Sequence, residues 1–342
     1  MSTSLPETYR AAFVVAKDAP FEIREVKLKM PGPGEVLVKT LASGVCGSDS
    51  EVVTQKTPIP LPQVIGHELC GNVVAAGEGE QKWEVGDLVG NGWHGGHDGT
   101  CDRCRKGDFN TCENEQIMGM TMPGSHAEYV LCRSEALAAM PKDMDPVEAA
   151  PLLCAGVTTF NSLRYMTLMP GDVVAIQGIG GLGHLAIQFA TKMGYKTVAL
   201  SGSDSKKKLA EQLGAHVYVD GSKKDQAEAL KEMGGAKVIA CTAPNSEVIN
   251  KLIGGLAVEG QLLILALAEE DLKIPVTPLV TKRLSVKGWP VGTPIDEEET
   301  VAFAQLQNIK PLVETYTLGE INEAYQRMKS GKARFRCVIK FD

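Results

Sequence analysis

The pattern of hydrophobic and polar positions changes character about halfway along the chain. Before residue 150, short β-branched runs such as 36–40 and 71–75 stand between turns rich in glycine and proline, for example 31–34 and 58–62. Runs of this length and spacing are typical of strands joined by turns. No segment of this half keeps a helical period for long. The first half is therefore predicted to be mostly β-structure.

From about residue 172, apolar runs of strand length alternate with runs of helical period. The predicted strands are 173–177, 197–200, 216–219, 237–241 and 261–267, and the predicted helices are 182–193, 206–213, 223–233 and 247–256. This alternation predicts βαβ units and a parallel sheet. The closing segment is mixed again, with helices predicted over 297–307 and 319–330 and a strand over 336–341. We expect this tail to return to the first domain.

Length and composition narrow the class of protein. The 342 residues correspond to about two domains, and 44% hydrophobic with 23% charged residues is a globular composition. A net charge of −7 argues against binding to nucleic acid or to an anionic membrane surface. No apolar run is long enough to cross a bilayer, and the first residues lack the pattern of a secretory signal. A cytoplasmic location is therefore expected.

A glycine-rich loop lies between the first predicted strand of the parallel sheet and the helix after it. Glycines at GxGxxG spacing permit a tight turn, close approach of a pyrophosphate to the backbone, and close packing of helix on strand. The phosphates then lie at the positive end of the helix dipole. The flanking strand and helix provide the context that this motif requires. The candidate dinucleotide-binding residues are Gly178, Ile179, Gly180, Gly181, Leu182 and Gly183.

The end of the second predicted strand bears on the choice of nucleotide. An NAD enzyme usually has a carboxylate there for the ribose hydroxyls, whereas this chain has Ser201, followed by Ser203 and Lys206. Hydroxyl groups and a lysine suit a 2′-phosphate, which a carboxylate would repel. We therefore expect NADP(H). Two alternatives stay open: Asp204 reaches back to the ribose and favours NAD, or Ser203 and Asp204 only cap a helix whose lysines are solvated.

Nine cysteines are present, and five of them lie among glycines, histidines or carboxylates, which indicates metal binding rather than disulfides. Those five are Cys46, Cys101, Cys104, Cys112 and Cys154. Cys46, Cys154 and His67 of a Gly-His-Glu segment make a set of two thiolates and one imidazole. This set leaves the fourth position of zinc open, as Lewis-acid catalysis requires. The remaining cysteines are expected to be reduced, buried and inert: Cys70, Cys132, Cys241 and Cys337.

Together with the glycine loop, these segments resemble those of zinc-dependent medium-chain alcohol dehydrogenases along essentially the whole chain. The similarity is greatest to the branch of yeast-type and cinnamyl alcohol dehydrogenases. The resemblance implies an α/β fold with two domains. Residues 1–153 and 291–342 would form a GroES-like β domain, and residues 154–290 would form a Rossmann-type domain with a doubly wound parallel sheet.

The resemblance also implies roles for the residues around the first metal set. Cys46, His67 and Cys154 match the ligands of the catalytic zinc, and Glu68 matches a glutamate that can enter the zinc sphere. Asp49 would orient the histidine ligand, as expected of a carboxylate beside it. Ser48 would bond the substrate oxygen and start a proton relay. Glu51 stands where many relatives carry a relay histidine; it either passes the proton on, if its pKa is raised, or is an exposed acid while water carries the proton.

A second cluster departs from the pattern of the family. The structural zinc lobe of relatives has four cysteines spaced CxxCxxCx₇C, whereas here an aspartate takes the first position: Asp98, Cys101, Cys104 and Cys112. A carboxylate is a harder donor than a thiolate, so a lower zinc affinity is expected. His94 or His97 could substitute for Asp98, and the lobe could also fold without metal.

The activity implied by the resemblance is interconversion of an alcohol and its aldehyde or ketone with NADP(H), in the direction of aldehyde reduction. Trp93 and Trp289 fall at positions that line the substrate cleft in relatives, which favours aromatic or medium-chain aldehydes. Relatives form homodimers or homotetramers. The alternatives are an NAD-dependent alcohol dehydrogenase, a zinc-free reductase of the same fold, and a non-catalytic nucleotide-binding relative. The intact ligand set argues against the last two.

Overall fold

The computed structural model describes residues 5–342, which divide into two compact units. Of the described residues, the first unit contains 5–154, Val291–Phe303 and Pro311–Asp342, and the second contains Ala155–Pro290 and Ala304–Lys310. No helix among the described residues is long and apolar enough to span a membrane.

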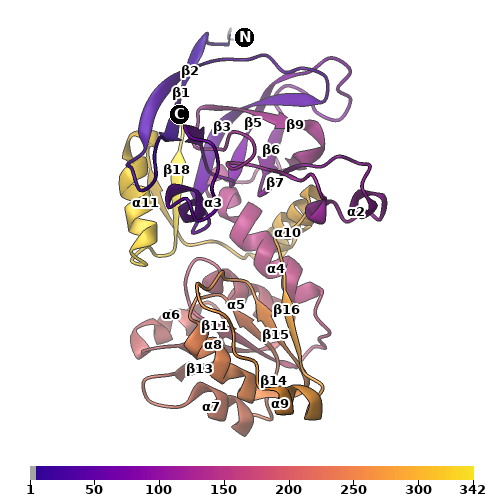
Figure 1. The fold of residues 1–342 in the computed structure, drawn as a ribbon, viewed down its shortest axis with the longest axis vertical. Coiled ribbons are helices and arrows are strands. Elements are labelled where there is room, and N and C mark those ends of the chain that lie inside the picture. Colours follow the sequence, from indigo (N-terminus) through magenta and orange to yellow (C-terminus); the bar gives the residue numbers. More distant parts are fainter. Residues whose placement is uncertain (1–4) are drawn as a thin grey trace. The chain divides into compact units, whose positions relative to one another are not determined.

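A seven-stranded mixed sheet forms the centre of the first unit (Figure 1). Its strands are β3 (Glu35–Val45), β5 (Leu69–Ala76), β6 (Leu88–Asn91), β9 (Tyr129–Arg133), β10 (Ala138–Ala139), β17 (Val313–Tyr316) and β18 (Arg336–Lys340). They follow the order β10-β6-β5-β3-β18-β17, and β9 also pairs with β3. Strand β18 is antiparallel to β3, so the closing segment of the chain is part of this sheet.

Smaller elements complete the first unit. A three-stranded sheet contains β1 (Thr8–Val14), β2 (Glu22–Lys27) and β4 (Gln63–Val64), and a two-stranded sheet contains β7 (His94–Gly96) and β8 (Gln116–Ile117). The helices are α1 (Asp49–Val53), α2 (Asp102–Arg105), α3 (Pro146–Pro151), α11 (Ile321–Lys329) and α10 (Pro294–Gln307), whose last residues belong to the second unit. Helix α11 buries Ile321, Ala324 and Tyr325 at helical spacing against the core that contains Val45 and Ile339.

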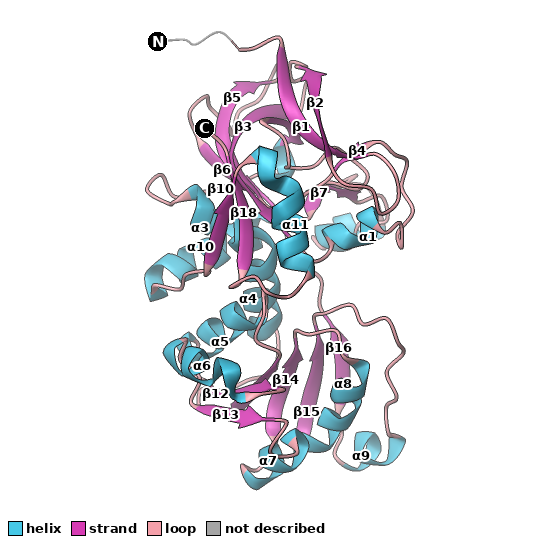
Figure 2. Cartoon of the chain, turned by 90° about the vertical axis from the view of Figure 1, so that its left-hand side faces the viewer, coloured by secondary structure: helices cyan, strands magenta, loops and turns pink. Residues whose placement is uncertain are grey.

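The second unit is a six-stranded parallel sheet with helices on both faces (Figure 2). Its strands are β11 (Val173–Gln177), β12 (Lys196–Ser201), β13 (Val217–Asp220), β14 (Ala236–Cys241), β15 (Leu256–Ile264) and β16 (Ser285–Gly288). Its helices are α4 (Val157–Arg164), α5 (Gly183–Lys192), α6 (Lys207–Gln212), α7 (Gln226–Glu232), α8 (Ser246–Leu252) and α9 (Val276–Thr281). The order β13-β12-β11-β14-β15-β16 reverses direction at β11, which is the doubly wound arrangement of dinucleotide-binding folds. The predicted α/β fold class is confirmed.

The sequence pattern locates most elements of the second unit, but the bounds of α8 and β15 differ from the predicted ones, and α4, α9 and β16 were not predicted. Helix α8 ends at Leu252, because the Gly254–Gly255 pair lies in the 3₁₀ turn that follows it, and strand β15 then begins at Leu256 and ends at Ile264. Helix α4 has no counterpart among the predicted elements. Nearly all of its side chains are buried, polar ones included, so the sequence shows no amphipathic period there.

Candidate active site

Four side chains of the first unit bring potential metal ligands together in its interior. The ligand atoms of Cys46, His67, Glu68 and Cys154 all lie within 4.8 Å of one another, and all four residues are buried. Cys46 follows β3, and the His67–Glu68 pair immediately precedes β5. Cys154 lies in a π-helical turn that follows α3. Ends of elements far apart in sequence thus converge on one point.

The arrangement of these atoms fits a zinc ion. The Sγ atoms of Cys46 and Cys154 lie 3.7 Å apart, close to the ~3.8 Å expected of two thiolates on one tetrahedral zinc with bonds of about 2.3 Å. This separation is far from the ~2.05 Å of a disulfide. His67 Nε2 and Glu68 Oε2 are buried without a hydrogen-bond partner among the described residues. Since such atoms are costly to leave unpaired, the donor set is suited to a bound cation.

Asp49 orients two members of this set. Its Oδ1 lies 3.3 Å from His67 Nδ1, and its Oδ2 accepts a 2.8 Å hydrogen bond from the backbone N–H of Cys46. Because Nδ1 faces a carboxylate, Nε2 is the ring atom turned toward the sulfurs. His126, which sequence reasoning missed, places its Nε2 3.6 Å from Asp49 Oδ2. Burial favours the neutral acid, but contacts with His126 and His67 hold the pKa of Asp49 well below its usual range.

Arg336 is a second residue that sequence reasoning missed. It begins β18 and forms a buried ion pair with Glu68. Burial raises the pKa of Glu68 to about 7, while the Arg336 guanidinium opposes this rise. Gly44 makes room for the pair, because a Cβ atom there would lie 1.7 Å from Glu68 Oε2. The feature of the sequence that could have identified Arg336 is its position, since this charged residue directly precedes the apolar run 337–339.

The predicted proton-relay residues lie on and before α1. Ser48 precedes the helix, and its Oγ is 3.8 Å from Cys46 Sγ. Glu51 is half-buried one turn later, and its backbone N–H donates to the carbonyl oxygen of Ser48. The structure thus places Ser48 beside the ligand set, with a carboxylate on the same helix.

The two tryptophans predicted to line a substrate cleft belong to different units. Trp93, in the first, is half-buried, and its ring contacts the His67 imidazole edge to face at 5.0 Å between centroids. Trp289, in the second, stacks on Tyr165 with centroids 5.0 Å apart. Trp93 is therefore a wall of the site around His67.

The glycine loop of the second unit shows why two of its glycines are sterically required and where the loop is open. Gly178 directly follows β11 with φ of +90°, and a Cβ there would lie 2.6 Å from Ala243 Cβ. Gly183 begins α5, where a Cβ would lie 1.9 Å from the carbonyl oxygen of Gly178. Gly180 faces open space, because a Cβ at that position would have no neighbouring atom of the described residues within 4 Å. A pyrophosphate-binding loop needs a tight turn, close packing of the helix on the strand, and free access of the pyrophosphate to the backbone, and this loop provides all three.

The residues after β12 are arranged around this loop. Lys206 Nζ donates a 2.6 Å hydrogen bond to the carbonyl oxygen of Ile179, so its ammonium lies against the glycine loop. The Asp204 carboxylate instead pairs with Lys223 at 2.6 Å. Ser201 ends the strand, and Ser203 makes no capping bond to the turn that follows. Lys206 is thus near the loop, whereas Asp204 is held by another lysine.

The second cluster also comes together in the first unit. The ligand atoms of Asp98, Cys101, Cys104 and Cys112 lie within 4.8 Å of one another, with Cys101 Sγ and Cys112 Sγ 3.9 Å apart. Asp98 is held in place by hydrogen bonds from the backbone of Thr100 and Cys101 and from the amide of Asn114.

The two nearby histidines are engaged elsewhere. His94 Nδ1 lies 2.8 Å from Glu115 Oε1, and its Nε2 lies 3.1 Å from His97 Nδ1. The His97 ring stacks on Phe109. Within residues 5–342, Asp98 is therefore the residue that the structure groups with the three thiols.

Comparison with known proteins shows the family of the chain. Residues 32–142 match the family described as alcohol dehydrogenase GroES-like domain, and residues 181–306 match the family described as zinc-binding dehydrogenase. The chain is 46% identical over 339 residues to alcohol dehydrogenase patD of Penicillium expansum, covering 99% of each protein. The chain belongs to the zinc-binding alcohol dehydrogenase family. The resemblance inferred from the sequence is thereby confirmed.

Solved structures of other alcohol dehydrogenases and reductases share the fold. A cinnamyl alcohol dehydrogenase from Helicobacter pylori, complexed with NADP(H), is 25% identical, with a TM-score of 0.88 and coverage of 98% of this chain and 99% of that one. Acetophenone reductase from Geotrichum candidum, complexed with NAD, is 27% identical, with a TM-score of 0.87 and coverage of 99% of both chains. Proteins similar to this chain are thus found with either nucleotide.

Proposed function

We propose that this protein is a zinc-dependent enzyme that interconverts an alcohol and its aldehyde or ketone with NADP(H), acting as an aldehyde reductase. Alcohol and aldehyde oxidoreduction follows from its family. The observation that carries the zinc-dependent chemistry is the buried set of Cys46, Cys154 and His67, whose Nε2 has no hydrogen-bond partner within residues 5–342. We also propose residues 1–153 and 291–342 as the catalytic domain and 154–290 as the cofactor domain.

Cys46, His67 and Cys154 would hold the catalytic zinc, which supplies Lewis-acid polarisation of the substrate oxygen when bound. Asp49 keeps the His67 ring in the orientation that presents Nε2. Glu68 Oε2 belongs to the same set of ligand atoms and accepts no hydrogen bond from the described residues. Arg336 balances the negative charge of the Glu68 carboxylate. We assign Glu68 as a further residue that would hold the zinc when neither substrate nor water occupies the open position.

The proton path is assigned to Ser48 and Glu51. Ser48 Oγ lies next to the ligand set, where it can accept the hydroxyl proton of an alcohol or return it to an aldehyde oxygen. Glu51 is half-buried one helical turn beyond, so its carboxylate can exchange that proton with solvent. Trp93 supplies a flat apolar wall beside His67, which supports aromatic or medium-chain aldehydes as substrates.

NADP(H) is favoured over NAD(H) by the residues after β12. The bound nucleotide supplies or accepts the hydride, and its pyrophosphate would lie on the loop 178–183. Ser201 leaves the ribose position without a carboxylate, Asp204 is paired with Lys223, and Lys206 holds a positive charge against the loop. A 2′-phosphate gains from that charge, whereas a ribose hydroxyl does not.

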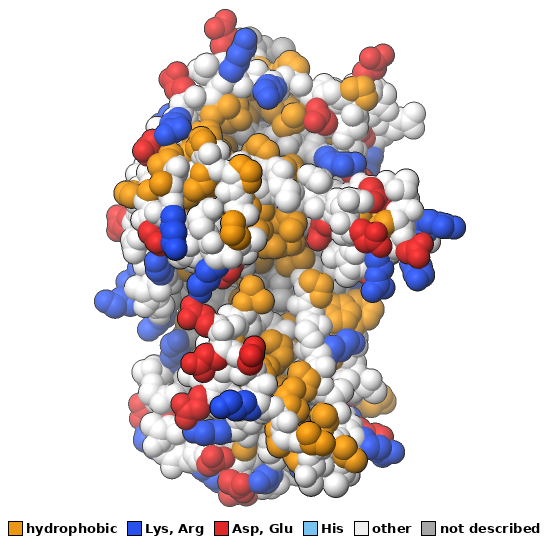
Figure 3. All heavy atoms as spheres, viewed as in Figure 1, with side chains coloured by type: hydrophobic (Ala, Val, Ile, Leu, Met, Phe, Trp, Pro, Cys, Tyr) orange, Lys and Arg blue, Asp and Glu red, His pale blue; other side chains and the backbone are white. Residues whose placement is uncertain are grey.

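A homodimer or homotetramer is supported by the surface of the second unit. Strand β16 ends the parallel sheet, and neighbouring α9 exposes Val276 and Val280, each about 70% accessible. Figure 3 shows hydrophobic side chains gathered on the second unit in the region where Figure 1 draws α9. An open strand edge beside apolar side chains is suited to association of two copies. A cytoplasmic location is proposed because zinc-binding thiols need a reducing compartment.

The activity is tested by adding NADPH and a panel of aromatic and aliphatic aldehydes to the purified enzyme. We expect oxidation of NADPH with at least one aldehyde, loss of activity after dialysis against a chelator, and recovery on addition of zinc. Turnover that survives complete removal of zinc would indicate a zinc-free reductase. A protein with full zinc content that turns over no aldehyde with NADPH or NADH would be a non-catalytic relative.

We assign a second, structural zinc to Asp98, Cys101, Cys104 and Cys112. Metal analysis of the gently purified protein is expected to give nearly two zincs per chain. Asp98→Cys should strengthen this site, because thiolate is a softer ligand, and raise Tm by about 2–4 °C for each kcal/mol gained. Asp102→Cys, at an exposed position of α2, is the matched control and should leave Tm unchanged. One zinc per chain, together with no effect of Asp98→Cys, would mean that the lobe folds without metal.

A further inference from the structure

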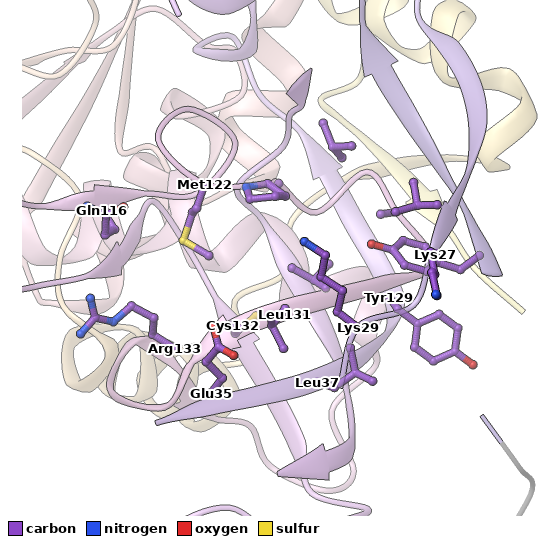
Figure 4. Close-up of a pocket in the computed structure, with 17 residues that line it drawn as sticks. Lys27, Lys29, Glu35, Leu37, Gln116, Met122, Tyr129, Leu131, Cys132 and Arg133 are labelled. Carbon is purple, nitrogen blue, oxygen red and sulfur yellow. The ribbon is translucent and has the colours of Figure 1, made fainter. Parts of the chain in front are cut away.

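The first unit contains a cavity of about 410 Å³ that shares no residue with either metal cluster. Side chains from β1, β2, β3 and β9 and from the segment 122–124 line it (Figure 4). We call it the β2–β9 pocket. Its volume lies within the range of ~300–1,000 Å³ usual for small-molecule sites.

The inner walls of the pocket are apolar and fixed by the fold. Val26, Leu37, Met122 and Leu131 supply aliphatic surface. The 122–124 wall is anchored, because Gly124 N–H donates to the Val64 carbonyl oxygen at 2.8 Å and the Gln63 amide donates to the Met122 carbonyl oxygen at 3.1 Å. Such a wall needs little ordering when a ligand binds.

Aromatic rings close one side of the pocket. Tyr9 and Tyr129 pack edge to face with centroids 5.7 Å apart, and both line the cavity. Burial raises the pKa of both phenols, so both hydroxyl groups are neutral at physiological pH. Two fixed rings offer a flat ligand both an apolar face and polar tips.

The charges around the pocket are mainly positive. Lys27, Lys29 and Arg133 line it, and Glu35 is the one carboxylate that does so among the described residues. Glu35 Oε2 already accepts a hydrogen bond from the backbone N–H of Gly32, and Arg133 is paired with Glu135.

Lys27 and Lys29 differ from Arg133 in having no ion-pair partner among the residues that the structure describes. No carboxylate forms an ion pair with either lysine in residues 5–342. Figure 4 shows the Lys29 ammonium directed over the middle of the lining side chains. Two exposed ammonium groups on the lining of an apolar pocket, neither in an ion pair with a described carboxylate, are complementary to a molecule with an anionic end and an apolar body.

We propose that the β2–β9 pocket binds a small aromatic carboxylate, whose anionic group lies on Lys27 and Lys29 and whose ring lies among Tyr9, Tyr129 and Leu131. This is a binding site separate from the catalytic centre. Charge-assisted hydrogen bonds to the lysines provide the preference for an acid, and the apolar walls provide the preference for a flat ring.

The test uses 2-naphthoate as the probe and its uncharged amide as the comparison, with binding to the zinc-loaded enzyme measured by calorimetry. We expect 2-naphthoate to bind at least tenfold more tightly than 2-naphthamide. Lys27→Met/Lys29→Met should weaken naphthoate at least tenfold and leave naphthamide unchanged. Gln116→Glu, a nearly isosteric change that adds a negative charge to the lining, should weaken naphthoate selectively.

Two controls separate this site from others that could take a carboxylate. Lys17→Met/Lys332→Met removes two exposed lysines outside the pocket and should not change naphthoate affinity. Cys46→Ser, which alters the catalytic metal set, should also leave it unchanged. The proposal is wrong if naphthoate does not bind at millimolar concentration, if Lys27→Met/Lys29→Met binds it as well as the unmodified enzyme does, or if Cys46→Ser abolishes binding.

Discussion

Replacement of Cys46 by serine is expected to remove most of the catalytic zinc and to lower kcat/KM for aldehyde reduction by roughly a thousandfold or more. A hydroxyl is a much poorer zinc ligand than a thiolate. The change removes one sulfur of a pair that lies 3.7 Å apart. Only Cys154 Sγ and His67 Nε2 of the three proposed zinc ligands would then remain. The measurement is zinc content and steady-state kinetics on the same preparation.

The fold should survive this substitution. Cys46 follows β3, whose pairing with β5 and β18 does not depend on the side chain at 46. Circular dichroism and the midpoint of thermal unfolding should therefore change little compared with the loss of activity. Cys70→Ala, which removes a buried thiol outside both metal sets, is the matched control and should keep both zinc and activity. If a Cys46→Ser preparation whose zinc content has been measured turns over substrate at the normal rate, Cys46 is not a zinc ligand.

Replacement of Ser201 by aspartate is expected to shift the nucleotide preference toward NADH by about two decades or more in the ratio of kcat/KM values. An aspartate at the end of β12 would accept hydrogen bonds from the ribose hydroxyls of NADH and repel the 2′-phosphate of NADPH. Each effect amounts to roughly 1.5–3 kcal/mol. Kinetics with both nucleotides at one aldehyde concentration measure the ratio.

Ser201→Asn separates charge from size at this position. Asparagine has nearly the shape of aspartate without the negative charge, so Ser201→Asn should lower the preference for NADPH much less than Ser201→Asp does. If the unmodified enzyme already prefers NADH, the assignment of NADP(H) is wrong, and the nucleotide must be recognised without a carboxylate at 201.

Lys206 gives an independent check of the same assignment. Because the Lys206 ammonium donates to the Ile179 carbonyl oxygen in the glycine loop, Lys206→Ala should weaken the binding of both nucleotides. The loss should be larger for NADPH, since only NADPH carries a third phosphate. Lys208→Ala removes an exposed neighbouring lysine and is the matched control. Equal losses for NADH and NADPH in Lys206→Ala would show that this lysine supports the loop and does not recognise the 2′-phosphate.

The sequence by itself determined the elements whose signals are local. Alternating apolar and amphipathic runs located β11 to β14 to within a residue or two, because strand and helix periods are properties of neighbouring positions. The spacing of Gly178, Gly180 and Gly183 identified the loop after β11 for the same reason. The end of α8 was predicted too late, because the 3₁₀ turn Ile253–Gly255 follows the helix directly, and α4 was missed, because burial of nearly all its side chains removes the amphipathic period.

Only the tertiary structure decided which distant residues meet. Cys46 and Cys154 are 108 positions apart, and Glu68 and Arg336 are 268 positions apart. The pairing of β18 with β3 brings Arg336 into the first unit's sheet, and the single turn after α3 brings Cys154 to Cys46. The tertiary structure also groups Asp98, and not His94 or His97, with the three thiols. It likewise pairs Asp204 with Lys223. Contacts of this kind depend on chain crossings and side-chain packing, which leave no periodic signal in the sequence.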